Sequence, residues 1–174
     1  MNKLSISNQL RSILNKMSNE DLNSFARILI EFVRENDKNF MDIADDSYLD
    51  FIRAINPPEY FIGKTGDDFR IISNGYLFKG FETKAETWRI ASTLIWDLIS
   101  YESEVVCPHC LSDQLRIYKN TVSGKTVFSC ETCFYSAEDG IEIKRPDTLV
   151  PASRLEIQNR EIKLPILPPS ETFK

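Results

Sequence analysis

The chain has 174 residues, of which 42% are hydrophobic and 11% aromatic, and its formal net charge is −5. This composition can bury one ordinary core with a small additional module beside it. Charged residues interrupt the apolar stretches within a few positions, which excludes a membrane-spanning helix, and the N-terminal residues lack the apolar core of a signal peptide. We therefore expect a cytoplasmic protein that does not act on a membrane.

The excess of acidic residues lies in the first part of the chain. Residues 1–104 hold 12 Lys and Arg against 17 Asp and Glu, whereas residues 105–145 hold five of each and residues 146–174 hold four of each. Neither part has the basic surplus that a nucleic-acid-binding protein uses to contact phosphates. The acidity favours a basic protein as the partner.

Two amphipathic helices are predicted near the N-terminus, over residues 4–17 and from Ser18 onward. Ser18 and Asp21 resemble a capping box. In the second helix, apolar residues recur at the i, i+3, i+4 and i+7 spacing of one buried face. They are Leu22, Phe25, Ala26, Leu29, Phe32 and Val33. We interpret this face as part of the protein's own core, in preference to a membrane-surface or partner-binding helix.

A third helix is predicted to end near Ala54, before the Asn56-Pro57-Pro58 sequence. Residues 42–50, at or before its start, are rich in carboxylates. They lack the alternating oxygen ligands, the glycine and the closing glutamate of a calcium-binding loop. We interpret them as a solvated acidic face, and as one face on which a basic partner could dock.

Residues 69–79 predict a β-hairpin. Phe69–Ser73 and Tyr76–Lys79 are rich in β-branched and aromatic residues. The Asn74-Gly75 dipeptide between them is the one that best tolerates the positive φ values of a type I′ turn.

A further helix begins at a capping box formed by Thr83 and Glu86, and its apolar stripe extends over four turns. The elements up to this point predict a mainly helical body over residues 1–104, with the hairpin at 69–79. Strands are expected in the following segment, so the predicted fold class is α+β.

Two Cys-x-x-Cys pairs, separated by nineteen residues, are the most informative motif. They are Cys107-Pro108-His109-Cys110 and Cys130-Glu131-Thr132-Cys133. Each pair places two thiolates on one tight turn, and two such turns face to face supply the tetrahedral shell of four sulfurs that suits Zn²⁺. Four thiolates leave no position for water, so one zinc ion would be structural and not catalytic.

Other chemistry for the same cysteines is less well supported. A redox Cys-x-x-Cys normally opens a helix after a strand, and neither pair has that setting. Two disulfides would require an oxidising compartment, which the missing signal peptide argues against. Iron in a rubredoxin-like site remains an alternative, because four sulfur ligands do not exclude it.

The residues between the pairs predict a hairpin, with strands at Leu115–Lys119 and Lys125–Ser129 and a turn at Asn120–Gly124. In its cysteines and this hairpin, the chain resembles the zinc-ribbon group, particularly the C-P-x-C … G-K-x-x-F-x-C-x-x-C form of transposase- and transcription-associated ribbons. The resemblance covers about residues 105–140. It implies a structural zinc ion in a module that binds nucleic acid, binds protein or braces a larger fold.

This chain departs from the ribbon pattern after each cysteine pair. Ribbons of this group usually carry glycine there, where φ is positive, but this chain has Leu111 and Phe134. We assign the ribbon to residues 105–145.

Residues 146–174 are predicted to form an extended tail. They contain five of the eight prolines, so a stable helix is not expected. The apolar residues that could line such a segment are Leu155, Ile157, Ile162, Leu164 and Ile166.

No catalytic residues are predicted. The only histidine, His109, lies inside a cysteine turn, and no metalloprotease, phosphate-loop, dinucleotide-binding or nucleophile-elbow motif occurs. We expect a non-catalytic, zinc-stabilised, cytoplasmic protein-binding module. Small acidic immunity or antitoxin-type inhibitors of basic toxins, or adaptors, have this general composition.

The alternative is a nucleic-acid-associated ribbon protein, related to transcription or to mobile elements. It would depend on phosphate contact and base stacking by Arg116, Tyr118, Lys119, Lys125 and Phe128, if these share one face. Otherwise these residues belong to a solvated hairpin whose aromatic rings pack on the zinc module.

Overall fold

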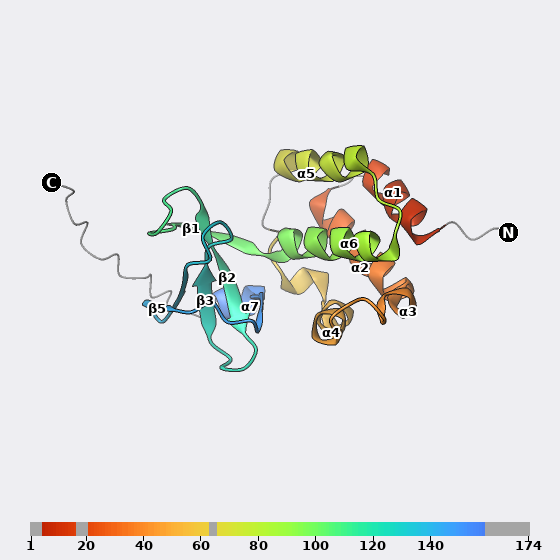
Figure 1. Ribbon diagram of the computed structural model, residues 1–174. Coiled ribbons are helices and arrows are strands. Elements are labelled where there is room, and N and C mark those ends of the chain that lie inside the picture. The colour runs from red at the N-terminus through yellow and green to blue at the C-terminus, as the bar shows by residue number, and fades with distance from the viewer. Residues whose placement is uncertain (1–4, 17–20, 63–65, 159–174) are drawn as a thin grey trace. The chain divides into compact units, whose positions relative to one another are not determined.

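The computed structural model describes residues 5–16, 21–62 and 66–158. The chain divides into two compact units, a helical unit that extends to Ile99 and a sheet unit that begins at Ser100 (Figure 1). The sequence placed the boundary between residues 104 and 105, whereas the first strand of the sheet begins at Tyr101. Helices and an antiparallel sheet occupy separate parts of the chain, so the predicted α+β class is confirmed.

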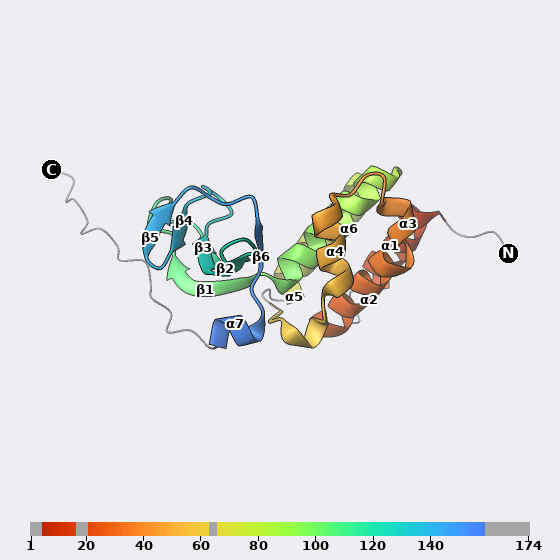
Figure 2. The same ribbon diagram turned by 90° about the horizontal axis from the view of Figure 1, so that it is seen from below.

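Six helices form the described part of the helical unit. They are α1 (Ile6–Lys16), α2 (Leu22–Glu35), α3 (Asp37–Phe40), α4 (Asp46–Ala54), α5 (Gly66–Lys79) and α6 (Lys84–Ile99), with a 3₁₀ turn at Pro57–Glu59. Helix α6 packs against α1, α2 and α3, and α4 packs against α2 (Figure 2). Helix α5 packs against α1 (Figure 1). None of these described helices combines the length and the apolar character needed to cross a membrane.

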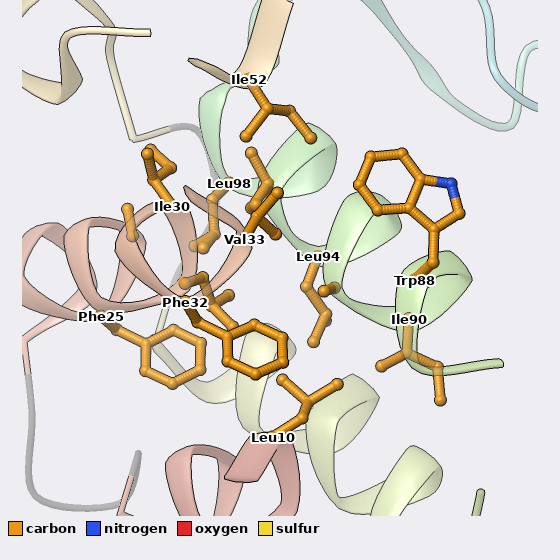
Figure 3. Close-up of a cluster of buried hydrophobic side chains, with 14 of the residues drawn as sticks. Leu10, Phe25, Ile30, Phe32, Val33, Ile52, Trp88, Ile90, Leu94 and Leu98 are labelled. Atoms are coloured by element: carbon orange, nitrogen blue, oxygen red, sulfur yellow. The ribbon is translucent and has the colours of Figure 1, made fainter. Parts of the chain in front are cut away.

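The core of the helical unit lies largely between α2 and α6. Figure 3 shows Phe32 and Val33 of α2 near Leu94 and Leu98 of α6, with Leu10 of α1 beside them. All five side chains are buried. The apolar face predicted for the second helix is therefore a core face, as expected.

Capping side chains explain where three of the helices begin. The Asp21 carboxylate accepts hydrogen bonds from the backbone N–H groups at the start of α2, and Asp45 does the same for α4. The predicted capping partner Ser18 lies outside the described residues. At the start of α6, the N–H of Glu86 donates to Thr83 Oγ1 at 3.2 Å and the N–H of Thr83 donates to Glu86 Oε2 at 3.0 Å, which is the predicted capping box.

The predicted hairpin at 69–79 is wrong, because this segment forms helix α5. Phe69 and Ser73 are buried four residues apart, and Tyr76 packs against the same core. Tyr76 stands seven residues after Phe69, so the two share one face in a helix but would lie on opposite faces in a strand. The Phe69 ring meets the Phe25 ring edge to face at 5.4 Å. Burial of this face therefore outweighs the local strand preference and the cost of Gly75 inside a helix, about 1 kcal/mol relative to alanine.

The sheet unit contains six short antiparallel strands and one short helix. They are β1 (Tyr101–Val106), β2 (Gln114–Asn120), β3 (Thr126–Ser129), β4 (Ser136–Glu138), β5 (Ile141–Ile143), β6 (Leu149–Pro151) and α7 (Arg154–Gln158). The strand order is β1-β2-β3-β4-β5, and β6 also pairs with β2. The predicted hairpin is confirmed as β2 and β3, in which Ile117 lies opposite Phe128.

Strands β1 and β6 share one edge of β2. Strand β1 pairs with the first part of β2, up to Ile117, and β6 pairs with its last part, from Tyr118 to Asn120 (Figure 2). The other edge of β2 is occupied by β3. Both edges of this central strand are therefore hydrogen-bonded along most of its length.

The segment predicted as an extended tail contributes to the sheet unit. Strand β6 is extended, as expected, but the prediction of no helix is wrong at α7. A capping box starts this helix, since the N–H of Ser153 donates to Glu156 Oε2 at 2.8 Å and the N–H of Glu156 donates to Ser153 Oγ at 3.3 Å. Ile157 also packs on the sheet core. The remaining tail residues, including Ile162, Leu164 and Ile166, lie outside the described residues.

Candidate metal centre

Two tight turns bring the four cysteines together. Cys107 and Cys110 lie on the turn that follows β1, and Cys130 and Cys133 lie on the turn that follows β3. The four Sγ atoms all lie within 4.8 Å of one another. Two of the pairs join the two turns, at 3.5 Å between Cys107 and Cys133 and 3.7 Å between Cys110 and Cys130.

These separations fit a metal ion held by four sulfurs. A tetrahedral zinc site with Zn–S bonds of about 2.3 Å places its sulfurs about 3.8 Å apart. A disulfide would bring two sulfurs to about 2.0 Å, and all four thiols are free. The donor set is therefore compatible with a zinc site, and it is the one group of metal-ligating side chains of this kind among the described residues.

The backbone repeats the same turn at each cysteine pair. The N–H of Leu111 donates to the C=O of Cys107 at 3.0 Å, and the N–H of Phe134 donates to the C=O of Cys130 at 3.1 Å. Each of these bonds closes a turn around one Cys-x-x-Cys sequence. The similarity of the two turns explains why the two pairs present their thiols in the same way.

Leu111 and Phe134 occupy left-handed backbone conformations, with φ values of 56° and 62°. These are the positions where the sequence suggested that glycine would normally stand. Both side chains are also well exposed, at 74% and 63%, so neither gains much burial in return for the strain. The backbone of the two turns therefore follows the geometry expected of zinc-binding turns, although the residues differ.

Burial separates the four thiols into two kinds. Cys107 and Cys130 are fully buried, whereas Cys110 and Cys133 are partly exposed. Burial raises the pKa of Cys107, and it raises that of Cys130 to about 12. Hydrogen bonds from Ser112, first from its side chain and then from its backbone, lower the pKa of Cys110 to about 6. A bound cation would favour the thiolate form of this buried pair.

Polar contacts fix the second turn from two sides. The Thr132 hydroxyl donates to Asp113 Oδ2 at 3.0 Å, which connects the segment after the first turn to the second turn. Arg145 donates to Glu131 Oε1 at 2.8 Å, and its guanidinium lies over the Phe134 ring at 5.2 Å. No local pattern in the sequence indicates these contacts, because they join residues far apart in the chain.

His109 lies beside the cluster and is not part of its sulfur set. Its side chain is exposed, its ring lies 5.1 Å from the Tyr135 ring, and its Nε2 is 3.9 Å from Glu142 Oε1. This placement agrees with the interpretation of His109 as a turn residue.

Three of the five residues on which a nucleic-acid role would depend are buried. Tyr118 and Phe128 are part of the interior of the sheet unit, and Arg116 is buried with an ion pair to Glu102 at 3.2 Å. Their rings and guanidinium are therefore not presented for stacking or for phosphate contact.

The two lysines among these five residues, Lys119 and Lys125, are paired with carboxylates. Lys119 Nζ lies 2.6 Å from Glu156 Oε1, and Lys125 Nζ lies 3.0 Å from Glu138 and 3.2 Å from Asp139. The five residues therefore do not form an exposed face of free cations and aromatic rings.

Comparison with known proteins gives no match to a family model, to a curated protein or to a solved structure.

Proposed function

We propose that the protein is a non-catalytic, cytoplasmic protein-binding module, stabilised by one structural Zn²⁺. Its sheet unit is a zinc ribbon, with Cys107, Cys110, Cys130 and Cys133 as the four ligands. The observation that carries the metal assignment is the clustering of the four Sγ atoms within 4.8 Å. Because four thiolates saturate the ion, it has no open position for a substrate or for water.

The helical unit is the part that we propose to bind a partner. Residues 1–104 carry the whole acidic surplus of the chain, which favours a basic protein. An inhibitor of the immunity or antitoxin type, or an adaptor, would use such a surface. The nucleic-acid alternative is less well supported, since the five side chains on which it depends are buried or ion-paired.

Metal analysis of the purified full-length protein tests the zinc assignment. We expect one zinc ion per chain and no iron. One equivalent of iron would show that the site is rubredoxin-like and not a zinc site. A metal-free protein whose sheet unit is folded would contradict the proposal.

Affinity purification from native cells, with and without nuclease treatment, tests the partner class. We expect a basic protein in stoichiometric amount that survives nuclease. Recovery of nucleic acid, or loss of every partner after nuclease treatment, would contradict the protein-binding proposal and favour the alternative.

A further inference from the structure

Helices α1 and α2 form an open groove of about 280 Å³ on the surface of the helical unit. Its lining includes Ser12 and Ile13 of α1 and Ile28, Glu31, Phe32 and Glu35 of α2. The four α2 residues stand at i, i+3, i+4 and i+7, so they share one face of that helix. This groove has an apolar floor and an acidic rim on the α2 side.

One of the three apolar side chains of the floor lies outside the core of the protein. Phe32 is almost fully buried, and Ile13 is partly buried against the core. Ile28 is only partly buried, and it is neither in the core cluster nor among the described side chains packed against it. An apolar side chain in this position gains burial when a further segment covers it.

The rim carries two carboxylates, those of Glu31 and Glu35. Glu31 and Glu35 are exposed, and among the described residues neither makes an ion pair. Elsewhere in the helical unit, Asp37 and Asp50 are both paired with Arg53. Within the described part of the structure, neither glutamate is therefore held by a counter-ion, and both carboxylates are exposed beside the apolar floor.

No described arginine forms an ion pair with this rim. The Arg34 guanidinium donates to the backbone C=O groups of Arg53 and Ile55, and Arg11 donates to the C=O of Phe81. Arg27 lies one turn before Glu31 on α2, and the described part of the structure shows no ion pair between them. Among the described residues, no Lys or Arg lines the groove.

We propose that this groove binds one basic amphipathic α-helix of a partner protein. The inference rests on the proposed function and names the segment of the partner that the helical unit would recognise. Successive residues of a helix rise about 1.5 Å, so Glu31 and Glu35 are about 6 Å apart along the axis of α2. Lys or Arg residues four positions apart on a facing helix have the same spacing, and an apolar side chain about one turn beyond the residue that faces Glu31 would cover Ile28.

The charge of the protein argues against two other occupants. A second copy of the chain would bring together two surfaces that are both acidic, since residues 1–104 hold 17 acidic against 12 basic residues. An anionic lipid surface would be repelled by the same glutamates. A basic helix is the occupant whose charge and apolar face both complement the groove.

Charge reversal with a matched control tests the groove. In the full-length, zinc-loaded protein, Glu31→Lys with Glu35→Lys reverses the rim. Glu104→Lys with Asp147→Lys changes two exposed carboxylates of the sheet unit and alters the net charge by the same amount. Both double variants and the wild type are purified by affinity from native cells, and the lysates are treated with nuclease. The amount of basic partner that each protein recovers is then measured by mass spectrometry.

We expect the groove variant to recover at least about tenfold less partner than the wild type, and the control variant to recover a similar amount to the wild type. Circular dichroism and metal content should be the same for all three proteins. Equal recovery by the two double variants would overturn the groove while leaving the proposed function intact. If the wild type recovers no basic protein, both the groove and the proposed function are overturned.

A photoreactive benzophenone amino acid in place of Ile28 identifies the bound segment. We expect it to cross-link to a partner peptide whose sequence predicts a helix with Lys or Arg four positions apart beside an apolar residue. The same amino acid in place of Val122, exposed in the turn between β2 and β3, serves as the control. A cross-linked peptide that is acidic or has no such pattern would overturn the proposal.

Discussion

The phenolic O–H of Tyr118 donates to Glu131 Oε1 at 2.7 Å, which ties the middle of β2 to the second cysteine turn. Arg145 donates to the same carboxylate oxygen at 2.8 Å. A residue between Cys130 and Cys133 is thus held by two partners from distant parts of the sheet unit. Burial, with a contribution from the Glu131 charge, raises the pKa of Tyr118 to about 12.

Removing this phenol is expected to weaken the sheet unit. Tyr118→Phe leaves Glu131 with one hydrogen bond fewer, and a hydrogen bond to a charged group contributes about 1.5–3 kcal/mol. We expect the zinc-loaded sheet unit to melt at a lower temperature at pH 7, as measured by near-ultraviolet circular dichroism. An unchanged melting temperature would contradict a stabilising role for this contact.

The same variant should differ from the wild type in alkali. Because the pKa of Tyr118 is higher in the folded state than its ordinary value near 10, its contribution to stability is complete below pH 10 and is lost as the pH rises through about 12. Tyr118→Phe should lack this part of the alkaline destabilisation. Denaturation midpoints measured between pH 9 and pH 12 would show the difference, and identical profiles would contradict it.

Loss of one buried thiol should unfold the sheet unit alone. Cys107→Ser removes one of the four sulfurs, and metal binding supplies much of the folding energy of a small zinc-binding module. The helical unit has a separate core, so we expect its far-ultraviolet helix signal to persist. Zinc content should fall below one equivalent per chain.

The control for this experiment is Val122→Ser, since Val122 is 81% exposed in the turn between β2 and β3. It should keep both zinc and the melting temperature. Unchanged zinc content and melting in the Cys107→Ser variant would contradict a four-thiolate site.

Glycine at the first cysteine turn should be tolerated or stabilising. At the positive φ of Leu111, an L-residue costs about 1–2 kcal/mol, while glycine adds about 0.5–1 kcal/mol of unfolded-state entropy. We expect Leu111→Gly to keep zinc and to raise the free energy of unfolding by up to about 1 kcal/mol in urea titrations. Val106→Gly, in the strand before the same turn, should instead lower it. A marked loss of stability in Leu111→Gly would show that its exposed side chain has a structural role.

The capping box of α6 predicts an acid-dependent stability. Backbone hydrogen bonds from Thr83, then from Glu82, lower the pKa of Glu86 to about 2. A lowered pKa means that the contribution of the carboxylate is present above its ordinary value near 4.5 and is lost as the pH falls through about 2. Glu86→Gln should therefore melt below the wild type at pH 7, and the difference should shrink between pH 4.5 and pH 2.

Asp42→Asn is a suitable control for this variant, because Asp42 is an exposed carboxylate of the helical unit outside any described capping contact. Its melting temperature should follow that of the wild type at each pH. A constant difference between Glu86→Gln and the wild type at every pH would contradict the assignment of the effect to the carboxylate charge.

The elements that the sequence predicted correctly are those specified by local signals. The cysteine pairs fix the spacing of two turns, the β2–β3 hairpin is short and rich in strand-forming residues, and the Thr83/Glu86 box is complete within four residues. Each of these features depends on residues that are near one another in the chain. Such signals are readable without knowledge of the tertiary structure.

The helix α5 and the contacts of Glu131 were not predictable in this way. The Asn74-Gly75 dipeptide is a strong local turn signal, but burial of Phe69 against Phe25 depends on a helix more than forty residues earlier in the chain. Likewise Glu131 meets Tyr118 and Arg145 only after the sheet has formed. Tertiary contacts override the local strand preference at α5 and add to the local turn structure at Glu131. Such contacts leave no periodic pattern in the sequence.

The pairing of β6 with β2 bears on how the protein forms during synthesis. All four cysteines have left the ribosome once residue 133 has emerged, but the edge of β2 from Tyr118 to Asn120 gains its partner only when Leu149–Pro151 follows. Until then, the nascent chain exposes unpaired backbone N–H and C=O groups that can pair with strands of other chains. A chain terminated after residue 145 would keep the complete sulfur set and yet be prone to aggregation.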